Sequence, residues 1–327
     1  MNPLRQLNHS LSAAIVFNFL LSLFWWLPWI LGFHAPEAVT VTAFYTLKLF
    51  DLSGLWVVLL EFVVCALLIF WTNHRFFFRD INTITYLQFS LMGLMCTTWF
   101  ESQTFGNHTI AVIFFVFAVS QLLKINDSSK NISKSILNTF VALSISSAFV
   151  YQYFYTIPVF IFGFLYFAAI NRLRILFISL VSIVVPAIVF LGFCYITDSI
   201  TVFTDYFFKI FSFVTGPFDI IFQEKLELFV LIFYTAVSMI LFLRNSPRIK
   251  YKTKKIIYFF VLLWFVLTIL TILFNDTEIF VLACIIYTSY LLTLNFVEFK
   301  NKLNRILFDS LLVLFLAMYV IRVFINL

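Results

Sequence analysis

Charged residues, glycine and proline are scarce in this chain of 327 residues. Asp, Glu, Lys and Arg together make up 11% of the sequence, Gly and Pro number seven each, and hydrophobic residues make up 63%. Soluble domains carry about 25% charged residues, because water must solvate their surface. The scarcity of charge therefore excludes a chain built of soluble domains, and the mean hydropathy of +1.05 indicates a protein embedded in a membrane.

Several catalytic motifs are absent as well. No Walker phosphate loop, GxGxxG, HExxH, GxSxG or CxxC pattern occurs, so nucleotide hydrolysis and zinc proteolysis lack support. The cysteines lie inside apolar runs and have no neighbouring histidine, so we interpret them as small core residues and predict no metal or redox site. They are Cys65, Cys96, Cys194 and Cys284.

Eleven apolar runs account for most of the chain. They cover residues 13–32, 53–72, 84–100, 109–123, 135–150, 156–170, 175–197, 226–243, 256–274, 278–297 and 307–325. Polar residues do not alternate with apolar ones in these runs, so helices are favoured over a β-barrel. The fold class predicted is all-α: one integral membrane domain over residues 1–327, a polytopic transmembrane helix bundle. The third to sixth runs are shorter than the ~20 residues of a straight crossing, so these helices are expected to thin the membrane locally or to lie inside the bundle.

The distribution of basic residues predicts the orientation. With the N-terminus in the cytoplasm, all of the 21 basic residues except Lys48, Lys209, Lys225 and Arg322 fall on the cytoplasmic side. Such alternation is the pattern that sets membrane topology, so we predict the N-terminus inside and the C-terminus outside. Their clustering between apolar runs favours contact with membrane lipids and gives no reason to expect nucleic acid as a partner.

Two predicted outer segments, residues 33–52 and 198–225, are longer than simple turns. The second contains the sequence TVFTDYFFKIFSFVT, in which Thr201, Asp205 and Lys209 share one helical face and Phe and Ile fill the other. This pattern predicts an amphipathic helix that lies in the outer membrane interface.

Glu61 lies near the middle of the second run. An ionised carboxylate at that depth costs about 2.5–3.5 kcal/mol, so intramembrane acids are candidates for function. Two alternatives remain open: Glu61 is a functional, proton-coupled group, or it pairs with a polar neighbour such as Asn18 or a Tyr hydroxyl and serves helix packing.

The hinge between the third and fourth runs, WFESQTFGNH (99–108), carries Glu101 and His108. A carboxylate and an imidazole at the outer face can act as a general base and as a phosphate contact. His34 and Glu37, in the first outer segment, are their expected partners, so Glu37, Glu101 and His108 are the candidate catalytic residues. Interfacial polar residues without a catalytic role remain the alternative.

The order of these features from about residue 72 to 197 resembles the membrane body of polyprenol-dependent glycosyltransferases of the GT-C superfamily. The resemblance rests on a basic inner turn (NHRFFFRD), the acidic outer hinge, an outer Pro158 and a basic inner turn (NRLR). It implies a GT-C-like arrangement in which Glu37 and Glu101 face a lipid-linked sugar. The same stretch is also similar to an uncharacterised family of multipass inner-membrane proteins of Bacteroidota.

Three functions follow as hypotheses for a multipass protein of the bacterial inner membrane. The first is a non-catalytic subunit or scaffold of an envelope-biogenesis assembly, with other inner-membrane proteins as partners. The second is a glycosyltransferase that uses a polyprenyl-phosphate-linked donor at the outer face, where His34, Lys209 and Lys225 would bind substrate. The third is a Glu61-dependent transporter or flippase. No cofactor is predicted, apart from a divalent metal if the protein is an enzyme.

Overall fold

The computed structural model describes residues 11–30, 39–43, 47–74, 86–99, 103–126, 132–167, 172–197, 200–212, 222–245, 251–274, 277–298 and 302–324. Its twelve α-helices are α2 (Leu11–Ile30), α3 (Leu55–Thr72), α5 (Leu87–Thr98), α6 (Asn107–Leu123), α7 (Ile132–Phe149), α8 (Ile157–Phe167), α9 (Arg172–Ile196), α10 (Ile200–Ser212), α11 (Phe222–Asn245), α12 (Tyr251–Phe274), α13 (Thr277–Glu298) and α14 (Lys302–Phe324). Short 3-10 helices, η3 (Lys124–Asn126) and η4 (Tyr151–Thr156), follow α6 and α7.

Each of the eleven predicted runs contains one helix, and α10 is the twelfth. Eight helices in the described part of the chain are long and apolar enough to cross a membrane: α2, α3, α7, α9, α11, α12, α13 and α14. The protein is therefore a helical, multipass membrane protein. Helices α5, α6 and α8 are shorter, and most side chains of α5 and α6 are buried among other helices. The number of crossings and their direction stay predictions.

Helix α13 is the centre of the bundle. It contacts α5, α6, α11, α12 and α14, and nearly all of its described side chains are buried. Hydrogen bonds join it to neighbouring helices: Trp264 Nε1 on α12 donates to Thr288 Oγ1 (3.0 Å), and Asn304 Nδ2 on α14 donates to the backbone carbonyl of Asn295 (3.0 Å). Such pairing is needed where no water can hydrogen-bond a buried polar group.

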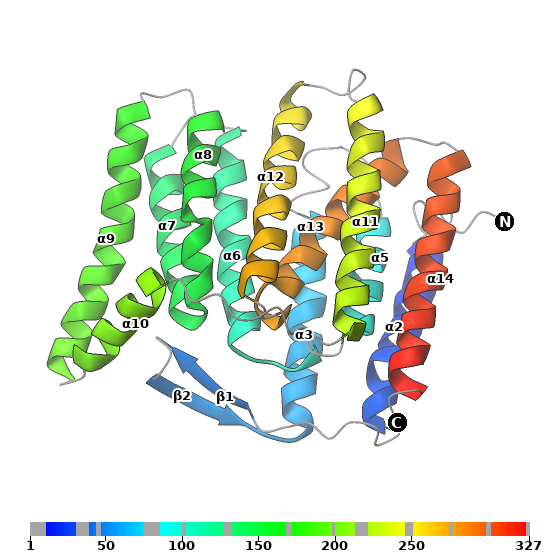
Figure 1. Cartoon of the computed structure of the whole chain (residues 1–327), viewed down its shortest axis with the longest axis horizontal. Coiled ribbons are helices and arrows are strands. Elements are labelled where there is room, and N and C mark those ends of the chain that lie inside the picture. The colour runs from blue at the N-terminus through cyan, green and yellow to red at the C-terminus, as the bar shows by residue number, and fades with distance from the viewer. Residues whose placement is uncertain are drawn as a thin grey trace.

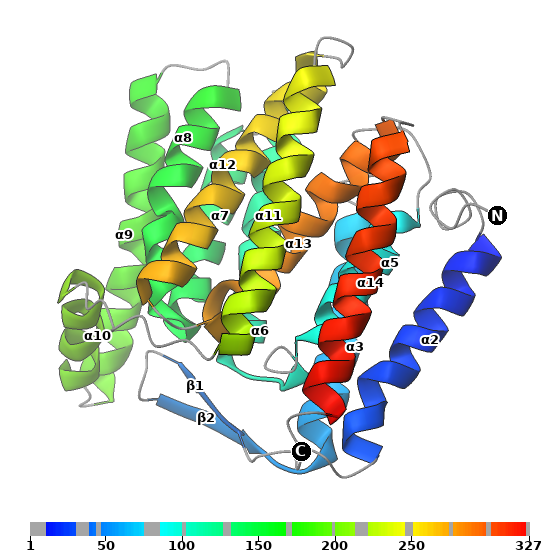
Figure 2. The ribbon, with the colours of Figure 1, turned by 45° about the vertical axis from the view of Figure 1, so that its right-hand side comes forward.

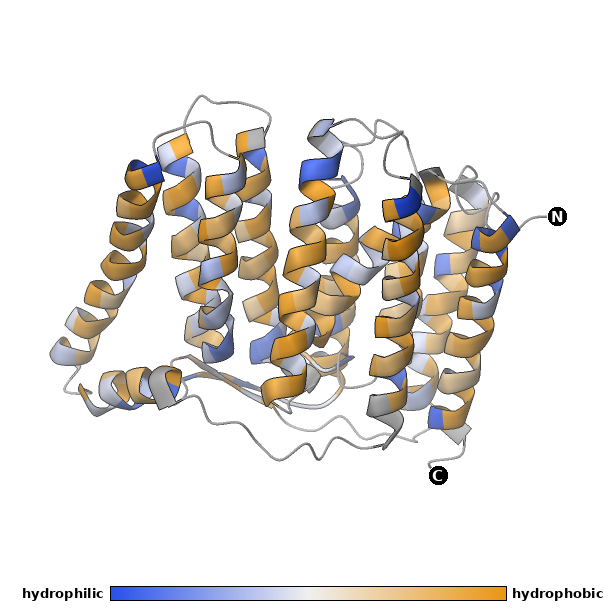
Figure 3. Ribbon diagram, turned by 45° about the horizontal axis from the view of Figure 1, so that its top comes forward, coloured by the Kyte–Doolittle hydropathy of each residue, from blue (hydrophilic) through white to orange (hydrophobic). Residues whose placement is uncertain are grey.

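The two ends of the bundle differ in chemistry. At the upper end in Figure 1, α6, α8, α11 and α13 finish and the helices after them begin. This end carries Lys124, Lys134, Arg172, Arg174, Arg244, Lys254, Lys255, Lys302 and Arg305, and we call it the basic end. Figure 3 shows the long helices as mostly hydrophobic between the two ends.

The opposite end carries a feature that the sequence did not suggest, a two-stranded antiparallel hairpin. Strands β1 (Val39–Ala43) and β2 (Leu47–Leu52) pair Val39 with Leu52 and Ala43 with Leu47. The hairpin lies inside the predicted outer segment 33–52. In β1, Val41 and Ala43 are buried and Thr40 is exposed, because alternate residues of a strand point to opposite faces. We call this end of the bundle the hairpin end (Figure 2).

Helix α10 also lies at the hairpin end, across the direction of the bundle helices (Figure 3). Tyr206 and Ile210 are buried against the bundle, whereas Thr201, Thr204 and Asp205 are exposed. The predicted amphipathic helix is thus present, and its apolar face packs on α9 and η4.

A buried ion pair joins two other helices near the hairpin end. Arg322 Nη1 of α14 lies 3.0 Å from Glu227 Oε2 of α11, and both side chains are largely buried. Breaking one partner of such a pair leaves a buried charge uncompensated. Each of the two charges is therefore stable in this apolar environment only when the other is present.

The packing around Gly163 leaves no room for an added methyl group. A Cβ at this position of α8 would lie 2.7 Å from Phe259 Cε2 and 2.8 Å from Leu122 Cδ1. We expect Gly163→Ala to lower the free energy of unfolding, because overpacking costs about 1–3 kcal/mol and the better helix propensity of Ala returns only about 1 kcal/mol. Gly192→Ala is the matched control, since no atom lies within 4 Å of its Cβ position. Equal thermal stability of both variants in detergent would contradict this packing.

Candidate functional site

Glu61 is held in a small polar cluster between α3 and α6. Its side chain is 0% exposed. Thr109 Oγ1 donates to Glu61 Oε2 (2.6 Å), and Cys65 Sγ, one turn further along α3, donates to Glu61 Oε1 (3.2 Å). Both carboxyl oxygens therefore have a donor, which offsets the cost of placing this group at membrane depth.

Glu61 does pair with a polar neighbour, as one of the two alternatives predicted, but not with Asn18 or a Tyr hydroxyl. Asn18 does not contact it: Asn18 Nδ2 donates to the Ser90 hydroxyl (3.1 Å) and to the Ala14 carbonyl (2.8 Å). The actual partner, Thr109, is the third residue of α6. Nothing in the sequence around Thr109 indicated a contact with α3.

Residues 103–106, which precede α6 in the hinge, hydrogen-bond to α2, α3 and α5. The Phe105 amide donates to the Val57 carbonyl (3.3 Å). Gln103 is buried, with its Nε2 donating to the Thr97 carbonyl (2.9 Å) and its Oε1 accepting from Trp29 Nε1 (3.2 Å). These bonds position the start of α6 along α3, and Thr109 of α6 lies next to Glu61 of α3.

The hairpin is tied to the first residue of α6. The Thr42 amide donates to Asn107 Oδ1 (2.9 Å), and Asn107 Nδ2 donates to Thr42 Oγ1 (2.8 Å). Gly106 lies close to the His108 ring and to β1: a Cβ at this position would lie 3.2 Å from His108 Nδ1 and 3.9 Å from Val39 Cγ1. The hinge, the hairpin and α3 therefore form one connected structure.

His108 lies inside this structure and not on an open surface. It is 9% exposed, and its Nε2 has no hydrogen-bond partner among the described residues. A buried, unpaired imidazole nitrogen is uncommon. It is the one predicted catalytic side chain that the structure describes.

The other predicted site residues are described only in part. His34, Glu37 and Glu101 lie outside the described residues, so their convergence with His108 stays a prediction. Lys225 lies in α11, but its side chain is likewise outside the described part. Lys209 is partly buried on α10. Within the described ranges, no group of three His, Cys, Asp or Glu is arranged to hold a metal ion.

A large apolar groove lies at the hairpin end of the bundle. Its volume is about 770 Å³, within the range of about 300–1,000 Å³ typical of small-molecule sites. It runs between the second halves of α7 and α9, and α10 and the hairpin border it at the hairpin end. The lining includes Ser144, Ala148, Phe149, Pro186, Ala187, Phe190, Phe193, Phe203, Phe207, Ala43 and Leu49.

Two hydrogen bonds fasten α10 along this groove. The Tyr206 hydroxyl donates to Ser147 Oγ on α7 (3.1 Å), and the Tyr155 hydroxyl of η4 donates to the Ile210 carbonyl (2.5 Å). Tyr206 lies outside the membrane-spanning segments, and its burial raises its pKa to about 12. The hydroxyl therefore stays protonated at neutral pH and can keep donating to Ser147.

The groove suits a ligand that is long and apolar. Phe149 both lines the groove and packs against the buried cluster of Val41, Val57 and Phe105 beneath the hairpin. The groove and the hinge are thus separated by a single layer of side chains. A lipid chain in the groove would bring its polar head to the end of the bundle that carries the hairpin and α10.

No family model, curated protein or solved structure matches this chain. The resemblance to the GT-C superfamily therefore stays a prediction from the sequence, and any function has to be argued from the site itself.

Thr109→Val tests whether the bond to Glu61 stabilises the fold. We expect the variant to lose about 1–3 kcal/mol of unfolding free energy, the cost of leaving a buried polar group unsatisfied. Thr109→Ser is the matched control: it keeps the hydroxyl, so its loss should be clearly smaller. The measurement is thermal unfolding of the purified protein in detergent. A valine variant as stable as the serine variant would refute the stabilising role.

Proposed function

We propose that this multipass membrane protein binds a lipid with a long apolar chain in the groove between α7, α9 and α10, at the outer face of a bacterial inner membrane. In this role it is a lipid-binding subunit of an envelope-biogenesis assembly. The observation that carries the proposal is the groove itself, about 770 Å³ in volume and lined almost entirely by apolar side chains.

The physical argument concerns selectivity. A lipid tail gains little by leaving other lipid tails for an apolar groove, because both surroundings are equally apolar. Binding therefore depends on the shape of the groove and on polar contacts to the head. The bulky rings of Phe190 and Phe203, 5.5 Å apart between centroids, give this groove a defined wall.

The orientation of the groove follows from charge. The basic end opposite to it is the end that the positive-inside pattern assigns to the cytoplasm. A ligand in the groove would accordingly come from the outer leaflet. A polyprenyl phosphate fits this description, since it combines a long apolar chain with a head that would lie near α10 and the hairpin.

Transfer of a sugar from such a carrier is the second candidate function. It is favoured by the unpaired Nε2 of His108, which offers a buried donor or acceptor to a phosphate or to the acceptor hydroxyl. Glu37 and Glu101 would supply the general base, and Lys209 and Lys225 would steady the leaving phosphate. A divalent metal remains an option for this candidate alone.

Transport through Glu61 has less support. Both oxygens of Glu61 are engaged by donors of the chain, and its side chain is 0% exposed. A proton-coupled site needs access from one side of the membrane at a time.

Filling the groove tests the proposal. Ala187 of α9 lines it, so we expect Ala187→Trp to reduce lipid that copurifies with the protein. A steric cost of about 1–3 kcal/mol corresponds to a loss of affinity of about 5-fold to 150-fold. Native mass spectrometry of the protein released from mild detergent measures the bound fraction.

Leu180→Trp is the matched control, because Leu180 lies on the same helix, is exposed and does not line the groove. Its lipid content should equal that of the unmodified protein. If Ala187→Trp retained the same lipid in the same amount, or if the unmodified protein carried none, the proposal would be wrong.

A further inference from the structure

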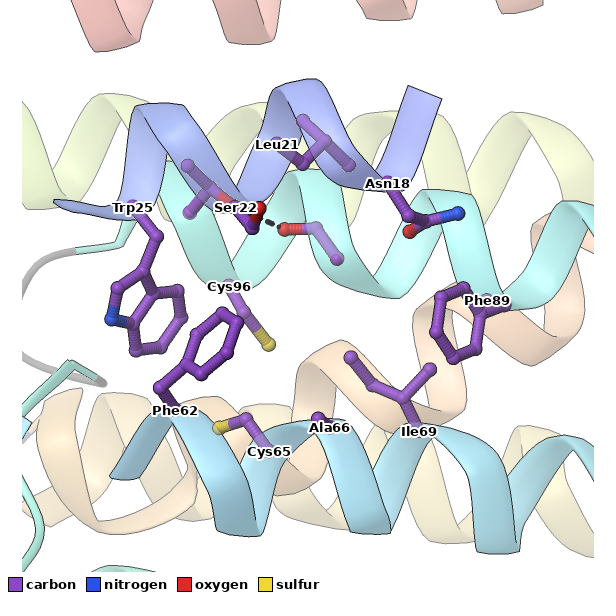
Figure 4. Close-up of a pocket in the computed structure, with 12 residues that line it drawn as sticks. Asn18, Leu21, Ser22, Trp25, Phe62, Cys65, Ala66, Ile69, Phe89 and Cys96 are labelled. Atoms are coloured by element: carbon purple, nitrogen blue, oxygen red, sulfur yellow. Dashed lines mark hydrogen bonds between the residues drawn. The ribbon is translucent and has the colours of Figure 1, made fainter. Parts of the chain in front are cut away.

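Two cysteines of different helices lie side by side in the bundle. Cys65 of α3 and Cys96 of α5 are 2% and 1% exposed, and both line the same small pocket. Figure 4 shows both sulfur atoms in the space between α3 and α5. The sequence gave no reason to pair them, because they stand 31 positions apart.

A proton acceptor is already in contact with this pair. Cys65 Sγ donates to Glu61 Oε1 at 3.2 Å, and the other carboxyl oxygen is held by Thr109. The thiolate is the reactive form of cysteine, and a carboxyl oxygen in contact with the thiol can act as the general base that takes its proton during the reaction.

The thiols also line a small pocket between α2, α3 and α5. Its volume is about 90 Å³, and its wall includes Trp25, Phe62 and Phe89. Asn18, Ser22 and Phe62 are partly exposed, so the pocket reaches the surface of the bundle, where hydrocarbon would surround it. An apolar oxidant dissolved in the membrane can therefore reach the mouth of the pocket, whereas a charged thiol such as glutathione is disfavoured there.

We propose that Cys65 and Cys96 are a redox pair that a membrane quinone oxidises to a disulfide between α3 and α5. Glu61 takes the proton of Cys65, the Cys65 thiolate adds to the quinone ring, and Cys96 attacks the Cys65 sulfur and displaces hydroquinone. Two S–H bonds break and one S–S bond forms. The quinone gains the two electrons and, through Glu61 and Cys96, the two protons.

The surroundings of Cys65 and Cys96 differ from those of the other two cysteines. Cys284 lies against the Thr271 hydroxyl at 4.0 Å, and Cys194 packs in an apolar cluster with Phe190 and Tyr206. The inference modifies the expectation that all four cysteines are inert core residues. It does not rest on lipid binding in the α7–α9–α10 groove, which lies elsewhere in the bundle.

Thiol counting tests the proposal directly. The full-length reduced protein in lipid nanodiscs is incubated with a fully ring-substituted benzoquinone, denatured, alkylated and weighed by mass spectrometry. We expect two of the four thiols to be lost, together with the mass of two hydrogen atoms, and the Cys65 and Cys96 peptides to be joined. Four thiols after treatment, or a disulfide between other cysteines, would overturn the proposal.

Four variants complete the experiment. Cys65→Ser and Cys96→Ser should each keep all remaining thiols, whereas Cys284→Ser should still form the disulfide. Glu61→Gln should slow oxidation by about 100-fold, the lower end of typical general-base contributions. An unchanged rate in Glu61→Gln, in a variant whose thermal unfolding matches that of the unmodified protein, would remove Glu61 from the reaction.

Discussion

The structure depends on one constraint: inside hydrocarbon, a polar group that finds no partner within the protein is costly. Most buried hydroxyls meet it by donating to a carbonyl one turn back on their own helix, as Thr271 does to Leu267. Glu61 cannot use this solution, because it needs donors. The bond from Thr109 therefore joins two helices, and it sets where α6 begins.

The arrangement of the hairpin end follows from that junction. With α6 fixed against α3, Asn107 is in position to hold Thr42 of β1, and the hairpin covers the start of α6. The hairpin and α10 in turn border the apolar groove. A polar contact in the interior is thus connected, through the first turn of one helix, to the surface on which a lipid would bind.

Much of the fold could be predicted from the sequence. Long apolar runs specify helices in a membrane, and all eleven contain one; the alternation of Thr, Asp and Lys with Phe also predicted α10. The hairpin was not predicted, because VTVTA and LKLFDL are short and lie in a stretch that charge and hydropathy mark only as a loop.

The candidate site was predicted less well than the fold. Hydropathy identified Glu61 as unusual and the hinge as polar, but periodicity says nothing about which helices are neighbours. The Glu61–Thr109 bond and the Cys65–Cys96 pair both join residues from separate runs. They depend on the tertiary packing of α3 with α5 and α6, which no local spacing encodes. The groove has the same origin, since it is a space between helices.

The orientation of the hairpin end is tested most directly by a reporter fused after Leu327. A phosphatase that folds only outside the cytoplasm should be active there, and a fluorescent protein that matures only in the cytoplasm should be dark when exported through the same fusion. An active cytoplasmic reporter and an inactive phosphatase would place the hinge, the hairpin and the groove on the inner side, and an outer-leaflet lipid could then not be the ligand.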